Sequence, residues 1–324
     1  MIVKGKRRWW AFFTEPGVVL VAPAFILYTA FFVWPALQAF YVSLCDWSGF
    51  APKKKFIGLS NFIELYHERL YWSAVTNNFV FMFLVGFFMF LFSLLFSAVL
   101  SNRRFFARRF FKTTLFSPYA ISVVAIAVLW TFIYDPNWGL LNGFLRPVVN
   151  FLVHLLNVII VPLLGASHRL PEFSNVAWLG SHWLAIGSLS AVMVWAGVGF
   201  YVVLLIAGID RIPDDLYEAA RIDGANERQN FFYITLPLLK DVLVIAISIH
   251  IIGSLKQFGL IFAMTRGMSA THVMETYMYD VAFDPLTKNF RLGYGTAMTV
   301  VLFTLVVLLT FTFNRLMRRA EVEY

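Results

Sequence analysis

Long apolar blocks separated by shorter polar segments make up most of the chain. A membrane-spanning helix needs about 20 apolar residues to cross about 30 Å of hydrocarbon, and six blocks meet that requirement. The pattern therefore predicts an all-α polytopic membrane protein with six transmembrane helices, in a transmembrane domain that covers residues 17–319. We expect the helices at about residues 17–44, 72–100, 114–134, 183–207, 238–262 and 293–313.

A further apolar block, Pro147–His168, is long enough to be a seventh span. If it crossed the membrane, every later segment would change sides, and the charged stretch that begins at Asp210 would lie outside. The block contains polar residues and a proline, and arginines flank it: Asn150, His154, Asn157, Pro162, Arg146 and Arg169. We therefore favour an interfacial or re-entrant helix on the outer face.

The distribution of Lys and Arg predicts which loops face the cytoplasm, because cytoplasmic loops are enriched in these residues. Four lie before the first span, five in the loop 102–112, four in the segment 208–240 and three in the tail. Lys53, Lys54 and Lys55 count against this arrangement, but their loop is longer than the arginine-rich loop 102–112. We expect both termini to be cytoplasmic, with residues 1–16 and 320–324 as flanking segments.

Composition excludes several classes of protein. The chain is 60% hydrophobic and 14% charged, whereas soluble domains carry about 25% charged residues. A soluble enzyme, a disordered chain and a coiled coil are thereby excluded, and the net charge of +8 is spread along the chain rather than gathered for nucleic acid. Cys45 is the single cysteine and the six histidines form no HExxH pair, so we expect neither a metal site nor catalytic residues.

The segment 210–237 breaks the apolar pattern with nine charged residues between Asp210 and Arg228. Its local signals predict two short helices. Pro213 suits a first helical position and the acidic pair that follows it favours a helix N-terminus. Gly224 can adopt a positive φ and end the first helix. Asn226 and Gln229 resemble a capping box that begins the second. On charge alone, an ordinary solvated cytoplasmic loop would account for this segment.

The order of residues in this segment points to something more specific. Glu218-Ala219-Ala220, then Gly224 after three residues, then Ile234 and Leu236-Pro237 resemble the signature of permease subunits of binding-protein-dependent ABC importers. The longer run from Tyr217 to Ala225 resembles the sugar-importer, maltose-type branch. Shorter stretches also resemble that family, at residues 56–62, 115–118, 178–180, 254–258 and 263–265, so the resemblance covers nearly the whole chain.

Two departures concern the outer side of the molecule. The family often has Gly-Gly-Pro after the threonine at position 265, whereas this chain has Arg266-Gly267-Met268. The block Pro147–His168 also looks like an insertion. These departures leave the cargo and the binding protein open, but they do not touch the predicted ATPase-coupling segment.

The resemblance implies a role for each matching residue. A short cytoplasmic coupling helix between the fourth and fifth spans would dock on a separate ATPase, since small alanines let a partner approach and the glycine sets the turn. The implied coupling residues are Tyr217, Glu218, Ala219, Ala220, Arg221, Asp223, Gly224, Ala225, Leu236 and Pro237. ATP and Mg²⁺ would bind the partner ATPase dimer, because this chain has no Walker A pattern.

The resemblance also implies a setting. A second permease subunit, homologous or identical, and an extracytoplasmic solute-binding protein would complete an importer in the cytoplasmic membrane of a bacterium or archaeon. The implied cargo is a sugar or oligosaccharide, with a glycerol phosphoester or a polyamine as alternatives. A secondary transporter driven by an ion gradient is the rival class. It would be expected to show intramembrane carboxylates, and the core of no predicted span contains Asp or Glu.

Lys256 and His250 are candidate residues of the substrate pathway. In a continuous helix that begins near Asp241, Lys256 would lie about 22 Å further along the axis. An ammonium group at that depth either snorkels to the outer interface or faces the interior of the bundle. In the second case it could donate hydrogen bonds to cargo.

Overall fold

The computed structural model describes residues 16–101, 107–164, 168, 170–283 and 290–318. The chain divides into two compact units, one formed by residues 1–68 and 278–301 and the other by residues 69–277 and 302–324. Several of the basic residues used to predict sidedness lie outside the described residues: Lys4, Lys6, Arg7, Arg8, Arg103, Arg104 and Arg319.

The first unit begins with an interrupted helix. An α-helix (α2, Pro16–Tyr28), a π turn (η1, Thr29–Val33) and a second α-helix (α3, Trp34–Val42) follow one another. The π turn lies just before Pro35, which has no N–H to donate to the preceding turn. The stretch Leu20–Val42 is long and apolar enough to cross a membrane, and its side chains are exposed or half-buried up to Val42, which is buried.

After α3, the first unit continues with two short strands and a short helix. Two-residue strands β1 (Cys45–Asp46) and β2 (Lys55–Phe56) pair antiparallel, and the helix α4 (Ser60–His67) follows them. Arg291 forms a two-pronged ion pair with Glu64, with N–O distances of 2.6 Å. The hydrogen bond from Arg291 holds the pKa of Glu64 below its usual range. This ion pair therefore persists at pH values where a free glutamate begins to take up a proton.

The second unit is a bundle around two long helices, α5 (Arg69–Ser101) and α9 (His182–Ile209), which make extensive contact with each other. Around them lie α6 (Arg108–Phe116), α7 (Val123–Ile133), α13 (Lys240–Leu255) and α14 (Gly259–Met264). The core includes Phe81, Leu189, Val192, Val202 and Ile261, each fully buried. Large apolar side chains such as Phe83 and Phe87 remain exposed on the outer surface of α5, as expected for a helix that faces lipid.

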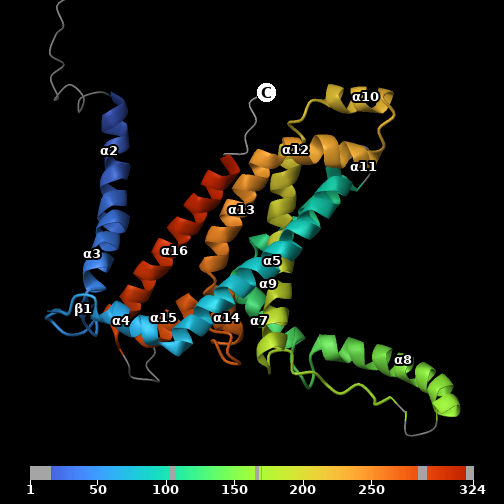
Figure 1. Ribbon diagram of the computed structural model, residues 1–324, viewed down its shortest axis with the longest axis horizontal. Coiled ribbons are helices and arrows are strands. Elements are labelled where there is room, and N and C mark those ends of the chain that lie inside the picture. Colours follow the sequence, from blue (N-terminus) through green and yellow to red (C-terminus); the bar gives the residue numbers. More distant parts are fainter. Residues whose placement is uncertain (1–15, 102–106, 165–167, 169, 284–289, 319–324) are drawn as a thin grey trace, which may run out of the picture. The chain divides into compact units, whose positions relative to one another are not determined.

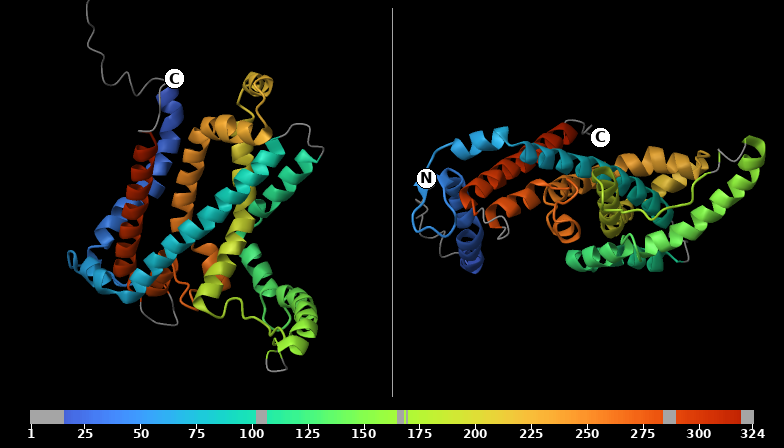
Figure 2. Two further views of the ribbon diagram at one scale, coloured as in Figure 1. Left: turned by 45° about the vertical axis from the view of Figure 1, so that its right-hand side comes forward. Right: turned by 90° about the horizontal axis from the view of Figure 1, so that it is seen from below.

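Three further helices complete the description. α8 (Leu140–Leu164) lies between α7 and α9 in the chain, α15 (Met274–Phe283) follows α14, and α16 (Leu292–Arg318) is the last. Figures 1 and 2 show that α8 runs crosswise to α9, near the end of α9 where His182 begins it. The short helix α10 (Asp214–Ile222) lies beyond the opposite end of α9 (Figure 1).

The prediction of an all-helical, polytopic chain is confirmed in outline. Five helices are long and apolar enough to cross a membrane, or up to seven if each of two bent pairs counts as one span. The predicted spans near residues 17–44, 72–100, 183–207 and 293–313 each coincide with a helix or helix pair of similar bounds. α8 passes the same test of length and composition, so these properties alone do not separate it from a span.

The predicted spans at residues 114–134 and 238–262 are not continuous helices in the structure. The first is bent by 97° between Arg108–Ala120 and Val123–Ile133, because a 3₁₀ turn at Ser117–Ala120 contains Pro118 and Ser122 is extended. The second ends at Leu255, because Lys256 leaves the helical region with φ −107° and ψ 53°. It is also bent by 68° where Glu227–Leu238 meets Lys240–Leu255.

Candidate functional site

The helix α10 lies in the charged segment 210–237 that follows α9. Pro213 is the residue before the helix, with an extended ψ of 135°, and Asp214 and Asp215 occupy the first turn. The prediction that Pro213 takes the first helical position was therefore wrong by one residue. The predicted acidic pair at the N-terminus is confirmed, and carboxylates at this end interact favourably with the helix dipole.

α10 ends in a Schellman motif centred on Gly224. The Ala225 N–H donates to the Ala220 carbonyl at 2.8 Å, and the Gly224 N–H donates to the Arg221 carbonyl at 3.1 Å. Gly224 has φ 83°, and a Cβ at this position would meet no atom within 4 Å. The requirement for glycine here is therefore one of backbone conformation alone, since L-residues rarely adopt this φ.

The second short helix starts with the predicted capping box. The Gln229 N–H donates to Asn226 Oδ1 at 3.0 Å, and the Asn226 N–H donates to Gln229 Oε1 at 2.8 Å. The helix α11 (Glu227–Asn230) then passes through a π turn (η4, Phe231–Thr235) and α12 (Leu236–Leu238) into α13. Leu236 is half-buried and Pro237 is exposed.

One side of α10 is open to a partner. Leu216, Ala219 and Ile222 follow one another at intervals of three residues, so they lie along one side of the helix. Ile222 is 87% exposed and Leu216 is 44% exposed, and Ala219 and Glu218 are exposed as well. The other side is anchored, because the Tyr217 hydroxyl lies 2.9 Å from the Thr235 hydroxyl of η4. The arrangement presents a small residue between two exposed apolar ones.

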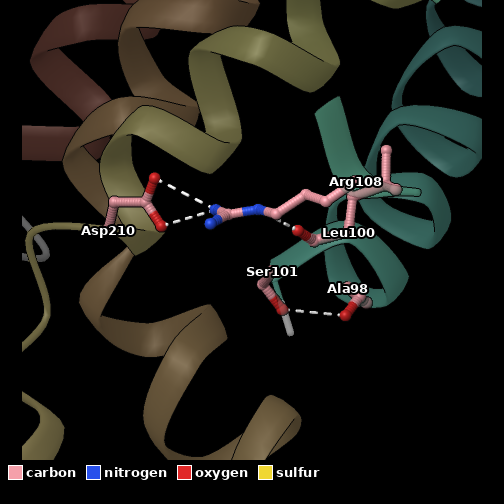
Figure 3. A network of polar contacts seen from close by, with 5 residues as sticks. All are labelled: Ala98, Leu100, Ser101, Arg108 and Asp210. Carbon is pink, nitrogen blue, oxygen red and sulfur yellow. Dashed lines mark hydrogen bonds and ion pairs between the residues drawn. The ribbon is translucent and has the colours of Figure 1, made fainter. Parts of the chain in front are cut away.

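An ion pair links Asp210, the first residue of the charged segment 210–237, to two helices. Arg108, at the start of α6, donates to both carboxylate oxygens of Asp210 at 2.8 and 3.1 Å. Its Nε–H donates to the Leu100 carbonyl near the end of α5, at 2.7 Å (Figure 3). Asp210 is the residue directly after α9, which ends at Ile209. One guanidinium therefore joins α5, α6 and the start of the charged segment.

A cavity of about 290 Å³ lies within the second unit. Its polar lining comes from Tyr119, Tyr201, His250, Ser254 and Gln257, and its apolar lining includes Met89 and Met193. The ring of Tyr119 stacks on Phe200 with centroids 4.9 Å apart. Two phenol rings and a side-chain amide in a pocket of this size provide both flat apolar faces and hydrogen-bonding groups.

A close approach of two helices positions His250. Its Nε2–H donates to the Met82 carbonyl of α5 at 2.9 Å, since a carbonyl can only accept. A Cβ at Gly86 would lie 2.7 Å from that nitrogen, so the glycine makes room for the ring. His250 is buried and lines the cavity, which places this predicted pathway residue beside the two tyrosines.

Lys256 lies elsewhere. It follows the end of α13, is exposed, and is not among the described residues that line the cavity. The Lys256 ammonium interacts electrostatically with the carboxylate of Glu275, on α15. That carboxylate also accepts a hydrogen bond from the Phe258 N–H. Burial raises the pKa of Glu275, and the Lys256 ammonium and this hydrogen bond lower it in part.

The chain belongs to the family described as "Binding-protein-dependent transport system inner membrane component", which matches residues 89–322. It is therefore the permease subunit of a binding-protein-dependent ABC importer and a multi-pass protein of the inner membrane. It is a transport subunit without catalytic activity of its own, and ATPase partners follow from the family. The resemblance to this family that the sequence showed is thereby confirmed.

Particular relatives cover nearly the whole chain. The probable ABC transporter permease protein YurN of Bacillus subtilis (strain 168) is 32% identical over 300 residues, which are 90% of this chain and 92% of that protein. The trehalose/maltose transport system permease protein MalF of Thermococcus litoralis is 30% identical over 297 residues, 91% of this chain and 90% of that protein.

A solved structure shares the fold. It is a chain of the bacterial alginate ABC transporter in complex with an alginate pentasaccharide-bound periplasmic protein. The TM-score is 0.74 at 19% sequence identity, with 96% of this chain and 98% of that chain covered.

Proposed function

We propose that α10 is the coupling helix on which the importer's ATPase docks. The observation that carries this proposal is the open stripe of Leu216, Ala219 and Ile222 on a helix that is held at Tyr217 and closed by a capped C-terminal turn. Tyr217 holds α10 against η4, and Arg108 ties Asp210, four residues before α10, to α5 and α6. A helix anchored in this way moves as a unit when ATP binding closes the ATPase dimer, and it rocks the permease between two states.

The proposed topology has six spans. Each bent pair counts as one span, α8 does not cross the membrane, and the transmembrane domain covers residues 17–319. Both termini and the coupling segment 210–237 then lie on the cytoplasmic side, with residues 1–16 and 320–324 as flanking segments. A second permease subunit, homologous or identical, forms the pathway together with this chain. ATP and Mg²⁺ belong to the ATPase dimer, and cargo arrives on an extracytoplasmic binding protein.

The proposed cargo is a sugar or oligosaccharide. The relative from Thermococcus litoralis is named for trehalose and maltose, and the alginate transporter is in complex with a periplasmic protein that binds an alginate pentasaccharide. The cavity fits such cargo chemically, because phenol rings can cover the apolar faces of a sugar while Gln257 and Ser254 bond its hydroxyl groups. His250 belongs to this part of the pathway. Lys256 and Glu275 would meet the cargo only outside the cavity.

Uptake by the complete importer tests the cargo and the cavity together. We expect unlabelled di- and oligosaccharides to compete with a labelled carbohydrate, and glycerol phosphoesters and polyamines not to compete. Gln257→Ala should raise the KM for uptake about tenfold, the equivalent of one lost hydrogen bond of about 1.4 kcal/mol. Gln38→Ala is the matched control, because Gln38 is an exposed glutamine of α3. Competition by phosphoesters alone would contradict a carbohydrate cargo, and an unchanged KM in Gln257→Ala would remove the cavity from the pathway.

A further inference from the structure

Three asparagines of α8 lie along one face of the helix. Asn150 comes eight residues after Asn142 and Asn157 comes seven after Asn150. At about 100° per residue, the three side chains fall within about 80° of one another around the helix axis. Asn150 and Asn157 are among the polar residues that set the block Pro147–His168 apart from an ordinary span.

These asparagines bind the chain as it returns from α8. Asn142 donates to the Val176 carbonyl at 2.9 Å and accepts from the Val176 N–H at 3.3 Å. Asn150 accepts from the Phe173 N–H at 2.7 Å. Asn157 donates to the Leu170 carbonyl at 3.1 Å and accepts from the Leu170 N–H at 2.8 Å. As the helix advances from 142 to 157, the bound partners run backwards from 176 to 170.

The lengths of the two segments match. Fifteen residues of helix rise about 22 Å, and six residues of extended chain cover about 20 Å. The segment 170–176 is therefore an extended segment, without strand pairing, that returns antiparallel along α8 over most of its length. α8 and this return segment form a hairpin, and the chain leaves the hairpin near the point where it entered.

This hairpin is incompatible with a span through lipid. If α8 crossed the bilayer, an extended segment would lie beside it in the hydrocarbon, where unpaired backbone groups are not tolerated against lipid. The exposed residues Glu172, Ser174 and Asn175 would be carried into the hydrocarbon as well, and a carboxylate at the centre of a bilayer costs about 3 kcal/mol or more. The hairpin is therefore a surface element.

The opposite face of α8 is apolar and uncovered. Its side chains are between 42% and 75% exposed: Leu140, Phe144, Val148, Phe151, Leu152, Leu155, Leu156, Val158, Ile159 and Leu163. By helical position, Arg146 lies on the asparagine face and no charged residue lies on this one. An uncharged stripe of ten large apolar residues exceeds what a water-exposed surface of a soluble protein carries.

We propose that α8 lies in the surface of the lipid bilayer, with this apolar face in the boundary between headgroups and acyl chains. The apolar face of α8 is continuous with exposed apolar residues of α7. The exposed Phe132 of α7 contacts Trp138, two residues before α8, with ring centroids 5.4 Å apart. Trp138 and Trp183 are both exposed, and tryptophan is enriched at the interface between membrane and water. These residues place the hairpin at that interface, with the asparagine face and the return segment toward water.

A soluble binding protein is the competing occupant, and the observations favour lipid. Surfaces that bind soluble partners reversibly are about as polar as the rest of the protein surface, whereas this stripe has no charged residue. That the lipid belongs to the outer leaflet rests on the proposed cytoplasmic position of α10, because α8 lies beyond the opposite end of α9. The hairpin itself does not depend on that side.

Depth measurements along one line of α8 test this proposal. Phe144, Phe151 and Val158 are spaced by seven residues on the apolar face, and each is at least 59% exposed. We would place a spin label on Phe144→Cys, Phe151→Cys or Val158→Cys in the complete importer, with Cys45 replaced by alanine, in vesicles of phosphatidylethanolamine and phosphatidylglycerol. The three labels should lie at the same depth, about 5–10 Å below the headgroups. A label on Ser174→Cys in the return segment should be accessible to water.

The other outcomes overturn the proposal in recognisable ways. A span would change the label depth steadily, by about 21 Å between positions 144 and 158. Labels that are open to water in vesicles and shielded only when binding protein is added would show a protein-docking face instead. Retained uptake in the labelled variants shows that the fold is intact. Equal depths in the cytoplasmic leaflet, with a label on Asn226→Cys reached from outside, would leave the hairpin in lipid and contradict only the proposed side of α10.

Discussion

Gly224→Val is expected to reduce transport and binding-protein-stimulated ATP hydrolysis at least tenfold, to near background. Gly224 holds φ 83° in the turn that ends α10, and a left-handed conformation costs an ordinary residue about 1–2 kcal/mol, with β-branched residues at the upper end. A loss of about 2 kcal/mol corresponds to roughly a thirtyfold change in the population of the turn. Uptake into cells and ATPase activity of the purified complex measure the effect.

Gly224→Asn is the matched control for this prediction. Asparagine adopts the left-handed conformation more readily than other residues with a Cβ, and a Cβ at this position meets no neighbour. We therefore expect this variant to keep most of its transport, while both variants insert into the membrane at normal levels. Wild-type transport in Gly224→Val would mean that the turn plays no part in coupling.

Arg108→Asp is expected to lower transport by about tenfold or more while the subunit still inserts. The substitution removes the two hydrogen bonds to Asp210 and the one to Leu100, and it places two carboxylates face to face. Hydrogen bonds to charged groups contribute about 1.5–3 kcal/mol, so loss of the connection should loosen the segment that leads from Asp210 into α10 from α5 and α6. Uptake at equal subunit levels is the measurement.

A reversed pair separates coupling from a general effect of charge. Arg108→Asp combined with Asp210→Arg should recover part of the lost transport, because the ion pair is restored with its ends exchanged. Arg109→Asp makes the same charge change on an exposed neighbouring residue and should leave transport nearly unchanged. Equal losses in the 108 and 109 variants, with no recovery in the reversed pair, would show that the contact itself is unimportant.

The positions of most spans could be predicted from the sequence because apolar length alone defines a membrane helix. The breaks within them could not. Pro118 was visible, but prolines are tolerated inside membrane helices, and nothing near Lys256 marks the residue at which α13 ends. The character of Pro147–His168 depended on whether its asparagines had partners, and those partners are backbone groups of an extended segment with no pattern of its own.

The candidate coupling segment was predictable because its signals are local. The capping box at Asn226, the glycine turn and the acidic start of α10 each depend on residues within a few positions of one another. The Arg108–Asp210 pair joins residues 102 positions apart. The cavity brings together Tyr119 of the 3₁₀ turn, Tyr201 of α9 and Gln257 from the break between α13 and α14. Single polar residues within apolar segments do not indicate which distant residues they will contact. The ion pair and the cavity lining therefore become visible only in the folded chain.

Cross-linking from the exposed side of α10 tests the central proposal most directly. Ile222 is 87% exposed, so a photoreactive amino acid can replace it without disturbing the core. In the active importer, we expect position 222 to cross-link to the ATPase subunit, and the same group at Ser174, in the return segment beyond the opposite end of α9, not to do so. Cross-linking of the ATPase from position 174, or none from position 222 in a complex that still transports, would contradict the assignment of α10 as the coupling helix.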